Sequence, residues 1–359
     1  MEQVLINQKS LKQKKNIKQI QKIAFRKYGR GHRAVVKAKM GKLVSLFRQE
    51  TTKLNNKKIT IPTLSQKDLL DKIRDNELTG MSGNDFPTAQ KLENFLQSEG
   101  KERILIVNGV ECEPGLLHDE WLLEHCIDEI IAGIRILSKT LQINHSVLAT
   151  KTDKKLEENE IEILRVPARY PMGEEHILLR QLFGIDLDKT THPAENGFLV
   201  LNVQTVYQIY LLCNGMYQKG RYVTLADIDT GEAKVIFVKN GENIRSILEN
   251  NFGKEKNKKY FAGGGILSAH PVNENECFKG NISFASVGTP ADISNENHCK
   301  KCGKCSRKCP MGVNVKEIVA RREQNTDADI TGLGLEKCIH CNSCTYFCRA
   351  GKNIAAMLV

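Results

Sequence analysis

The sequence of 359 residues contains no long uncharged apolar run. The longest such stretches, Ile104–Val107 and Phe198–Val203, fall far short of the roughly 20 residues that a membrane-spanning helix needs. The first ten residues, MEQVLINQKS, place an acid at position 2 and lack the apolar core that is typical of a secretory signal. These absences exclude an integral membrane protein and argue against secretion.

Aromatic residues are also scarce, at 6% of the chain. The most basic segment, residues 1–60, holds 17 Lys and Arg against 2 acids, whereas the remaining residues hold 36 against 40. The net charge of +11 therefore belongs to an N-terminal arm, which is typical of a solvated extension or of docking to an acidic partner, a membrane surface or nucleic acid. Because only Phe25, Tyr28 and Phe47 could stack on bases there, no nucleic-acid partner is expected.

Cysteine, in contrast, is abundant and clustered. Eight of the 12 cysteines lie in the last 61 residues, in two tight runs. Such clustering in a long chain favours metal ligation over disulfide bonds. We therefore expect a protein of a reducing compartment, the cytoplasm.

Both runs have the spacing C-x2-C-x2-C-x3-C of bacterial ferredoxins, and only the first is followed by proline. Two zinc knuckles are the alternative, but zinc sites usually pair two C-x2-C units, which a doubled four-cysteine run fits poorly. In two-cluster ferredoxins the fourth ligand of each [4Fe–4S] cluster comes from the other run. This rule predicts one cluster held by Cys299, Cys302, Cys305 and Cys348, and a second held by Cys338, Cys341, Cys344 and Cys309.

The four remaining cysteines are isolated in the sequence. Cys126 and Cys213 lie in apolar periodic stretches and are expected in the core. Cys112 lies in the polar turn NGVECEPG, where a redox role is conceivable.

Strands and helices alternate from about residue 61 to residue 215. The periodicity predicts helices over 64–78, 89–100 and 116–140, and strands within 103–115, 145–150 and 161–167. A charged loop is expected over 151–160. Such alternation favours a parallel α/β domain over 61–215.

The pattern changes after Gly215. RYVTLADI and EAKVIFVKNG are typical of a hairpin, and ENIRSILEN of one helix, so a small α+β module is expected over 216–272. Its end, FAGGGILSAHPV (261–272), is predicted to be a loop near a ligand or another backbone. The cysteine-rich region forms a last unit over 290–359.

Two features of the α/β region could bind a ligand. The glycine-containing loop 80–91 precedes a helix, an arrangement that can hold phosphate on backbone N–H groups. Glu111 and Glu113 follow a strand, where the ligands of α/β sheets tend to bind, and could accept hydrogen bonds from ribityl, ribose or nicotinamide groups. A solvated acidic turn is the alternative interpretation of these two acids.

Taken in order, these blocks resemble one family. GMSGNDFPTAQKL, NGVECEPG, RYPMGEEHILLRQLFG, LNVQTVYQI, FAGGGI and the two cysteine runs resemble the RnfC-like family of the Rnf ferredoxin:NAD oxidoreductase, with its soluble relatives PrdC of proline reductase and PduS of propanediol utilisation. The resemblance spans about residues 64 to 348. More distantly, the sequence resembles the flavoprotein subunit of respiratory complex I.

This resemblance implies a Rossmann-like FMN-type domain, a small β-grasp (SLBB) module and a mostly helical dicluster ferredoxin domain. It implies that FMN exchanges hydride with NAD(H) and single electrons with the two clusters, to or from a partner protein such as another Rnf-type subunit, a ferredoxin or a reductase. A place at the inner face of a membrane, through partners, is part of this expectation. The matching flavin-site positions are Gly80, Gly83, Phe86, Pro87, Thr88, Lys91, Asn108, Glu111, Glu113, Tyr170, Gly173, Glu174, Glu175, Asn202 and Thr205.

The flavin loop departs from the family pattern at Ser82, Asn84 and Asp85. Cβ atoms at Ser82 and Asp85 restrict φ and narrow the approach of the backbone to a ligand. The negative charge of Asp85 would repel a phosphate at 4 Å by about 1–4 kcal/mol. Lys91 would offset part of this cost by pairing with Asp85 or with the ligand. The departures motivate an alternative function, in which the flavin site has decayed and the chain is a cluster-only relay or docking subunit for a partner reductase.

Overall fold

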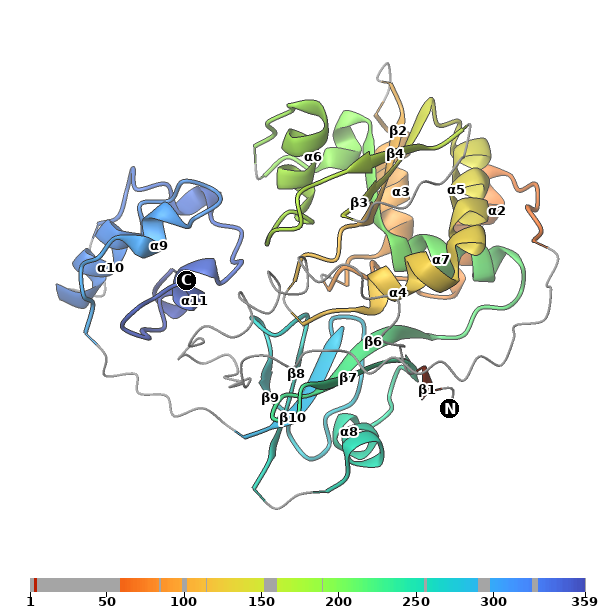
Figure 1. Ribbon diagram of the computed structural model, residues 1–359. Helices are drawn as coiled ribbons and strands as arrows, with labels where there is room; N and C mark the ends of the chain where they lie inside the picture. Colours follow the sequence, from red (N-terminus) through yellow and green to blue (C-terminus); the bar gives the residue numbers. More distant parts are fainter. Residues whose placement is uncertain are drawn as a thin grey trace.

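The computed structural model describes residues 3–4, 59–83, 85–98, 102–113, 115–151, 160–188, 190–254, 257–289, 298–324 and 329–358. Figure 1 shows a helix-flanked sheet, a second sheet that packs beside it, and the cysteine-rich C-terminal region in blue. Nearly all of the basic arm 1–60 lies outside the described residues, so its expected role stays a prediction. In the ranges described, no helix has the length and apolar character that crossing a bilayer requires.

The first sheet is parallel, as the strand–helix alternation predicts. Its order is β4-β3-β2-β5, with β2 at Ile104–Gly109, β3 at His145–Thr150, β4 at Glu162–Arg165 and β5 at Phe198–Asn202. Ile106 of β2 pairs with Val147 and Val200 on either side. In the same register Asn108 lies beside Asn202, so two polar side chains end neighbouring strands at the carboxyl edge.

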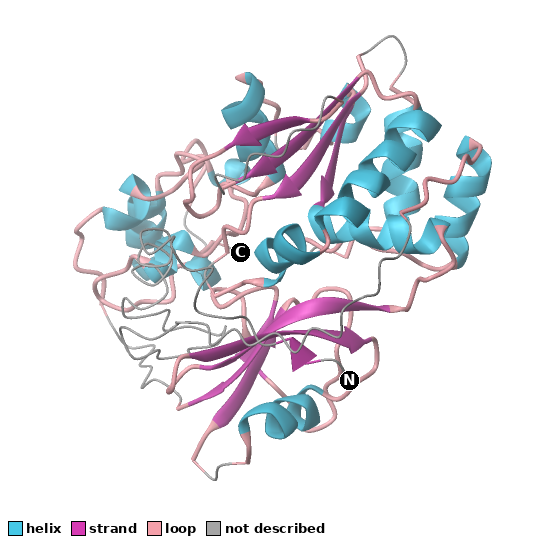
Figure 2. Ribbon diagram, turned by 45° about the vertical axis from the view of Figure 1, so that its right-hand side comes forward, coloured by secondary structure: helices cyan, strands magenta, loops and turns pink. Residues whose placement is uncertain are grey.

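Helices cover both faces of this sheet. Leu105 and Val107 point into a core shared with most of the helices, whereas Ile106 points to the opposite face, which α6 covers. The larger group consists of α2 (Gln66–Asp75), α3 (Thr88–Leu96), α4 (His118–His125), α5 (Ile127–Leu141) and α7 (Val203–Cys213), and α6 is Glu175–Phe183. Figure 2 shows these helices, in cyan, on either side of the magenta strands.

Ordinary local signals set the helix boundaries. The Ser65 hydroxyl accepts a hydrogen bond from the Asp68 N–H at 3.1 Å, and the Asp68 carboxylate accepts one from the Ser65 N–H at 3.3 Å, which starts α2. Gly184 ends α6 in the left-handed conformation, with φ of 69°.

The single helix expected over 116–140 is wrong, because the structure has two helices that meet at Cys126. Cys126 leaves the helical conformation, with φ of −127° and ψ of 29°. The break lets the two helices follow different surfaces. Trp121 of α4 packs on Tyr222 of the second sheet, with ring centroids 5.0 Å apart, while α5 packs closely on α7. Gly133 permits that second contact, since a Cβ there would lie 2.7 Å from the Val206 carbonyl oxygen.

The second sheet has the order β1-β7-β6-β10-β8-β9. The predicted hairpin is present as β6 and β7, and α8 (Ile244–Phe252) covers one face of the sheet. β10 pairs with β6 in parallel and with β8 in antiparallel orientation. The strands are β1 (Gln3–Val4), β6 (Gly220–Asp227), β7 (Glu232–Lys239), β8 (Lys259–Gly263), β9 (His270–Pro271) and β10 (Phe284–Gly288).

The loop expected over 261–272 is only partly a loop. Residues 261–263 complete β8 and residues 270–271 form β9, so the turn is confined to the residues between them. Backbone pairing of Phe261 with Ser286 and with Pro271 explains the difference, since β8 lies between two partners. The sheet also extends beyond the 216–272 range, because β10 completes it.

Short helices form the cysteine-rich region around one apolar cluster that includes Val313, Ile318 and Ile354. The helices are α9 (Lys304–Arg307), α10 (Val315–Gln324) and α11 (Ser343–Tyr346), and the 3-10 helices of this region are η3 (Leu335–Lys337) and η4 (Ala355–Met357). A further 3-10 helix, η2 (Pro193–Asn196), belongs to the α/β domain. Two cysteines, Cys305 and Cys344, belong to this buried cluster.

Candidate functional site: two cysteine clusters beside a flavin-type domain

The two cysteine runs adopt the same local conformation. In each run, the residues immediately before and after the second cysteine are left-handed: Lys301 and Gly303 in the first, His340 and Asn342 in the second, with φ between 50° and 67°. The third cysteine then enters a short helix, α9 or α11. Such a winding lets the three thiols of a run face one point, as a cubane cluster requires.

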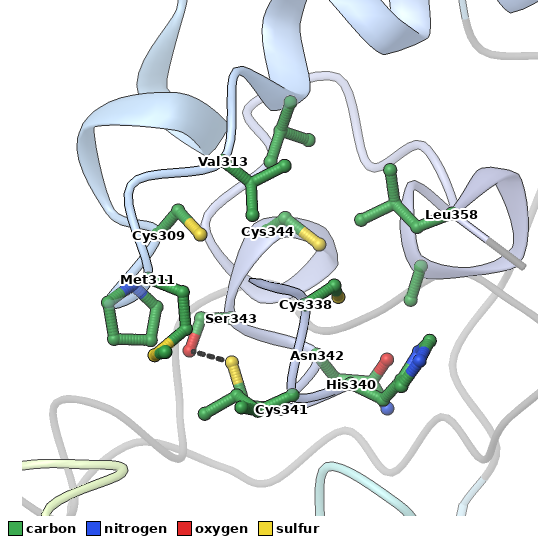
Figure 3. A pocket seen from close by; sticks show the side chains of 14 residues that line it. Cys309, Met311, Val313, Cys338, His340, Cys341, Asn342, Ser343, Cys344 and Leu358 are labelled. Atoms are coloured by element: carbon green, nitrogen blue, oxygen red, sulfur yellow. Dashed lines mark hydrogen bonds between the residues drawn. The ribbon is translucent and has the colours of Figure 1, made fainter. Parts of the chain in front are cut away.

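The fourth thiol of each set comes from the other run. Cys309 lines one pocket together with Cys338, Cys341 and Cys344, as Figure 3 shows. The Cys305 thiol lies near Cys299 and Cys348, which raise its pKa together with the larger effect of burial. The structure therefore brings together the four cysteines of the second predicted set, and Cys299, Cys305 and Cys348 of the first.

The environment of the thiols is typical of ligands to an iron–sulfur cluster. Burial raises the pKa of the Cys344 thiol to about 12, so that a thiolate there needs the charge of bound metal to form. N–H groups also point at the sulfurs: Lys301 donates to Cys299 Sγ at 3.3 Å and Lys352 to Cys348 Sγ at 3.4 Å. Such hydrogen bonds tune the potential of an iron–sulfur cluster.

The predicted flavin blocks converge at the carboxyl edge of the first sheet. The Met81 N–H donates to the Thr205 hydroxyl at 2.9 Å, which joins the loop 80–91 to α7. Lys91 Nζ lies 2.5 Å from Glu175 Oε1, which joins α3 to α6. Residues from blocks more than 80 positions apart thus share one site.

The second and third blocks are joined in the same way. Asn108 Nδ2 donates to the Gly173 carbonyl at 2.8 Å. Gly173 must be glycine for this approach, since a Cβ would lie 2.9 Å from the Val110 carbonyl oxygen. The Gly173 N–H donates to Cys112 Sγ at 3.1 Å, and burial raises the pKa of this thiol to about 12, which disfavours a reactive thiolate.

The other predicted positions mostly organise local structure. Gly80 donates to the Phe86 carbonyl at 2.8 Å and closes the loop, and Glu174 accepts from the Ile177 N–H at 3.0 Å and caps α6. The Thr88 hydroxyl is buried without a hydrogen-bond partner, near the uncapped N-terminus of α3. This unpaired donor and the helix N-terminus fit an anionic ligand such as the phosphate of FMN.

The Asp85 carboxylate does not form the expected ion pair with Lys91. Lys91 pairs with Glu175 and not with Asp85. The Asp85 carboxylate accepts a hydrogen bond from the Thr79 hydroxyl and lies against Gly280, where a Cβ would clash with it. Burial lowers the pKa of Arg221 in the second sheet to about 10, and the charges of Asp119 and, to a smaller extent, Asp85 oppose this lowering. Asn84 lies outside the described residues.

Sequence reasoning missed Arg221. This guanidinium is 1% exposed and donates from Nη2 to the Met81 carbonyl at 2.5 Å and to the Ser283 hydroxyl at 3.0 Å. It also donates to the Gly280 carbonyl. A lone arginine at the start of a strand carries no recognisable motif, so nothing in the sequence singled it out. It fixes the flavin-type loop to the second sheet.

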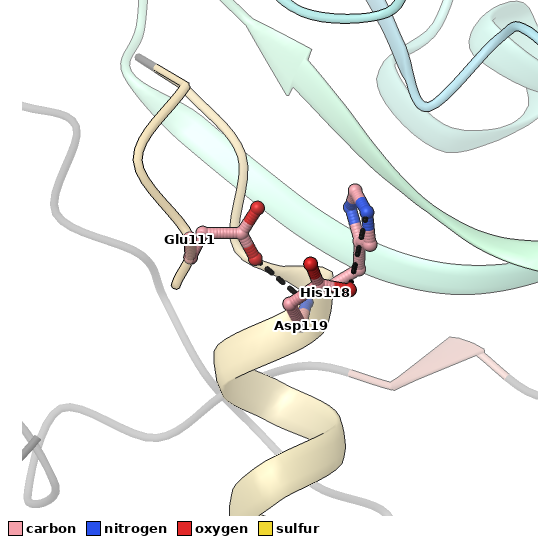
Figure 4. Close-up of side chains that lie close together, drawn as sticks. All are labelled: Glu111, His118 and Asp119. Atoms are coloured by element: carbon pink, nitrogen blue, oxygen red, sulfur yellow. Dashed lines mark hydrogen bonds and ion pairs between the residues drawn. The ribbon is translucent and has the colours of Figure 1, made fainter. Parts of the chain in front are cut away.

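Three buried polar side chains, Glu111, His118 and Asp119, lie close together, as Figure 4 shows. Glu111 Oε2 accepts from the Asp119 N–H at 2.6 Å, and Asn202 donates to Asp119 Oδ2 at 2.7 Å. Burial raises the pKa of Asp119 to about 6 and that of Glu111 well above its usual value, and it lowers the pKa of His118 to about 3. Although these three side chains lie close enough for a metal, nearby Lys151 and Arg221 already supply positive charge.

A hydrogen-bonded chain connects the second block to the cysteine-rich region. The Tyr170 hydroxyl donates to the Cys341 carbonyl at 2.7 Å and lies within hydrogen-bond reach of Glu113. Burial raises the pKa of Glu113 to about 7. One hydroxyl hydrogen cannot serve two acceptors, so a protonated Glu113 that donates to Tyr170 satisfies both bonds. Asn342 adds a second link, from its Nδ2 to the Leu267 carbonyl at 2.8 Å.

Comparison with known proteins agrees with this arrangement. Residues 73–211 match the Nuo51 FMN-binding domain, and residues 298–353 match a 4Fe–4S dicluster domain. A crystal structure of an NAD+-reducing [NiFe]-hydrogenase has a similar fold, with a TM-score of 0.54, 16% identity, and coverage of 73% of this chain and 54% of that one. Fold and site together define an electron-transfer protein built from an FMN-binding type of domain and a 4Fe–4S dicluster domain.

The relatives are more specific. The chain is 30% identical over 285 residues to the C subunit of the ion-translocating oxidoreductase complex of Haemophilus influenzae, covering 74% of this chain and 42% of that protein. It is 28% identical over 265 residues to the C subunit of the proton-translocating ferredoxin:NAD(+) oxidoreductase complex of Clostridium ljungdahlii, covering 70% and 57%. These matches confirm the resemblance to the RnfC-like family, and the chain spans about half the length of these relatives.

Proposed function

We propose that this chain passes electrons between NAD(H) and a partner protein, through FMN in the α/β domain and two [4Fe–4S] clusters in the C-terminal region. The observation that supports this most directly is the Tyr170 bridge. Tyr170 belongs to a predicted flavin block and donates a hydrogen bond to the backbone of Cys341, a predicted cluster ligand. A flavin site and a cluster site that share a hydrogen bond are close enough to form one relay.

The domain plan of this proposal follows the sequence. Residues 61–215 form the flavin-type domain, 216–272 with β10 the SLBB module, and 290–359 the dicluster domain, while 1–60 is a basic arm. FMN, when bound, accepts a hydride as a pair of electrons and releases them singly. The protein groups proposed to hold it are the backbone of residues 80–83 and 85–88, the N-terminus of α3, Asn108, Glu113 and Glu175.

The partner is proposed from the relatives. Those proteins are subunits of ion-translocating oxidoreductase complexes, so a second subunit or a soluble carrier would take or supply the single electrons of this chain. Through such a subunit the chain would be held at the face of a membrane.

The first test is a measurement of iron, acid-labile sulfide and flavin per chain on one anaerobically purified sample. We expect about eight irons and about one FMN, followed by bleaching of the cluster absorbance when NADH is added. Eight irons with no flavin, even after FMN is supplied, would exclude the hydride step in this chain.

The second candidate is the cluster-only relay, and the side chains in the flavin loop favour it. Ser82 and Asp85 stand where the family has glycine, and the Asp85 carboxylate fills the space beside Gly280. A variant with Ser82→Gly, Asn84→Ala and Asp85→Gly tests it. Under this candidate the variant gains FMN binding that the unchanged protein lacks. Tight FMN binding by the unchanged protein eliminates the candidate.

A further inference from the structure

The surface around the first cysteine run carries charge of one sign. Residues 298–316 contain six Lys and Arg and no Asp or Glu. α9 and α10 bring two of the cations together, since a Cβ on Gly303 would lie 3.2 Å from Arg307 Nη1 and 3.5 Å from Lys316 Cδ. We call the five exposed cations the basic surface: Lys300, Lys301, Arg307, Lys308 and Lys316.

The cluster beneath this surface is the more accessible of the two. Of the eight cysteines in the runs, Cys302 is the one that is exposed, and it lies between Lys301 and the α9 cations. Cys341, the equivalent second cysteine of the other run, is half-buried, and the residues that follow it, Asn342 and Ser343, are buried. An electron that leaves through Cys302 therefore crosses little protein.

The second run faces the opposite way. Its residues Cys341 and Asn342 are hydrogen-bonded to Tyr170 of the α/β domain and to Leu267 in the loop between β8 and β9. The first run is held by bonds within its own region, such as the one from the Cys299 N–H to Glu323 Oε1 at 3.2 Å. The inner cluster thus faces the flavin-type domain, and the outer cluster faces the basic surface.

We propose that the basic surface is the docking site of an acidic one-electron carrier protein, which exchanges electrons with the cluster of Cys299, Cys302, Cys305 and Cys348. This inference rests on the proposed function, because it requires a [4Fe–4S] cluster at Cys299, Cys302, Cys305 and Cys348. Each docking event moves one electron, so one carrier is reduced as the outer cluster is oxidised. Two such events balance the oxidation of one NADH to NAD+ and a proton.

Charge complementarity selects the occupant. An acidic protein supplies the negative surface that five exposed cations attract over a distance of about a Debye length. An anionic membrane would also be attracted, but surface-binding segments insert apolar side chains, and Ile59 is the one large hydrophobic residue that is exposed in the described part of the chain. The docking charges are therefore assigned to a protein partner.

The test compares two triple variants of the full-length, cluster-loaded protein. Lys300→Glu, Arg307→Glu and Lys316→Glu reverse three charges of the basic surface. Lys239→Glu, Lys254→Glu and Lys259→Glu make the same change in charge on exposed residues of β7, of the loop after α8 and of β8. The probe is a small acidic bacterial ferredoxin, and its dissociation constant is measured at about 50 and about 500 mM salt. The basic arm is present in both variants and contributes equally.

We expect the first variant to bind ferredoxin at least about tenfold more weakly at low salt, chiefly through slower association, and the second to bind like the unchanged protein. Equal weakening in both variants, or no weakening in the first, overturns the proposal. Binding of the basic surface to phosphatidylglycerol vesicles in preference to ferredoxin overturns it in favour of a lipid surface.

A second readout separates this inference from the proposed function. NADH-driven bleaching of the clusters, measured without ferredoxin, depends on the flavin site and not on the basic surface. The first variant is expected to retain it. If the unchanged protein shows no bleaching but still binds ferredoxin through the basic surface, the NAD(H) role fails and the docking site stands. Iron content and the visible spectrum establish that both variants carry their clusters.

Discussion

The two cysteine runs share one spacing and one backbone conformation, yet their surroundings differ. The first run lies under five exposed cations and includes the exposed Cys302. The matching stretch of the second run, residues 337–355, holds three Lys and Arg and no acid, and two of these cations are exposed, Lys337 and Arg349. This run is also hydrogen-bonded to Tyr170 of the α/β domain and to Leu267 in the loop between β8 and β9. Identical ligand chemistry can therefore serve different positions in a relay, because the surrounding residues decide which cluster faces inward.

The largest expected effect comes from the exchanged ligands. Cys309 belongs to the first run, but it lines the pocket of Cys338, Cys341 and Cys344. Cys309→Ser should therefore destroy the cluster that the second run holds. Cys348→Ser should destroy the other cluster. Iron per chain is expected to fall from about eight to about four in each case, with different electron paramagnetic resonance signals remaining.

Cys277→Ser, at an isolated cysteine, is the control and should retain all the iron. If Cys309→Ser and Cys348→Ser leave the same remaining signal, the exchange of ligands is wrong.

The next effect concerns Glu113, which lies within hydrogen-bond reach of Tyr170 beside the second cysteine run. Because burial raises the pKa of Glu113 to about 7, the folded protein binds this proton more tightly than the unfolded chain does. Stability from this group is therefore greatest below about pH 4.5 and falls as the pH rises to about 7, by about 3 kcal/mol in all. Glu113→Gln should therefore flatten the fall in stability between about pH 4.5 and pH 7.

Denaturation followed by the fluorescence of Trp121, the single tryptophan, measures this change. Asp119 contributes a slope of the same sign, since its pKa is also raised, so the comparison is between the two proteins at each pH. An unchanged slope in Glu113→Gln would show that Glu113 is not the group responsible.

A smaller effect is expected at the bridge itself. Tyr170→Phe removes the donor to the Cys341 carbonyl, at a cost of about 1 kcal/mol of stability. The altered backbone beside Cys341 should shift the reduction potential of the inner cluster and leave that of the outer cluster unchanged, as a redox titration would show. Tyr260→Phe deletes a comparable hydroxyl, bonded to Glu249 at 2.9 Å, and should shift neither potential.

The smallest effect is expected where the second run carries its own cations. Lys337→Gln with Arg349→Gln removes two exposed charges close to the inner cluster. Ferredoxin affinity should change by less than about twofold, because exposed charges outside a docking surface contribute little. If ferredoxin affinity falls as far as it does in the basic-surface variant, the two runs do not differ in their contribution to docking.

Much of this organisation could be predicted from the sequence, because periodicity and ligand spacing are local properties. The parallel strands at 104–109 and 145–150 and both cysteine sets follow from short stretches of sequence. The break at Cys126 could not be predicted, since it depends on two different surfaces that α4 and α5 cover. The same holds for the partner of Lys91 and for Arg221, whose contacts join segments 84 and 140 residues apart in the chain.

The exchange of Cys309 and Cys348 has a consequence for how this region can be divided. A protease cut between Gln324 and Asp329 would leave each half with three ligands of one cluster and the fourth ligand of the other. Neither half could then retain a fully liganded cluster after separation, although each contains a complete four-cysteine run. The two runs are interlocked, so the region should be gained, lost or transplanted between proteins only as a whole.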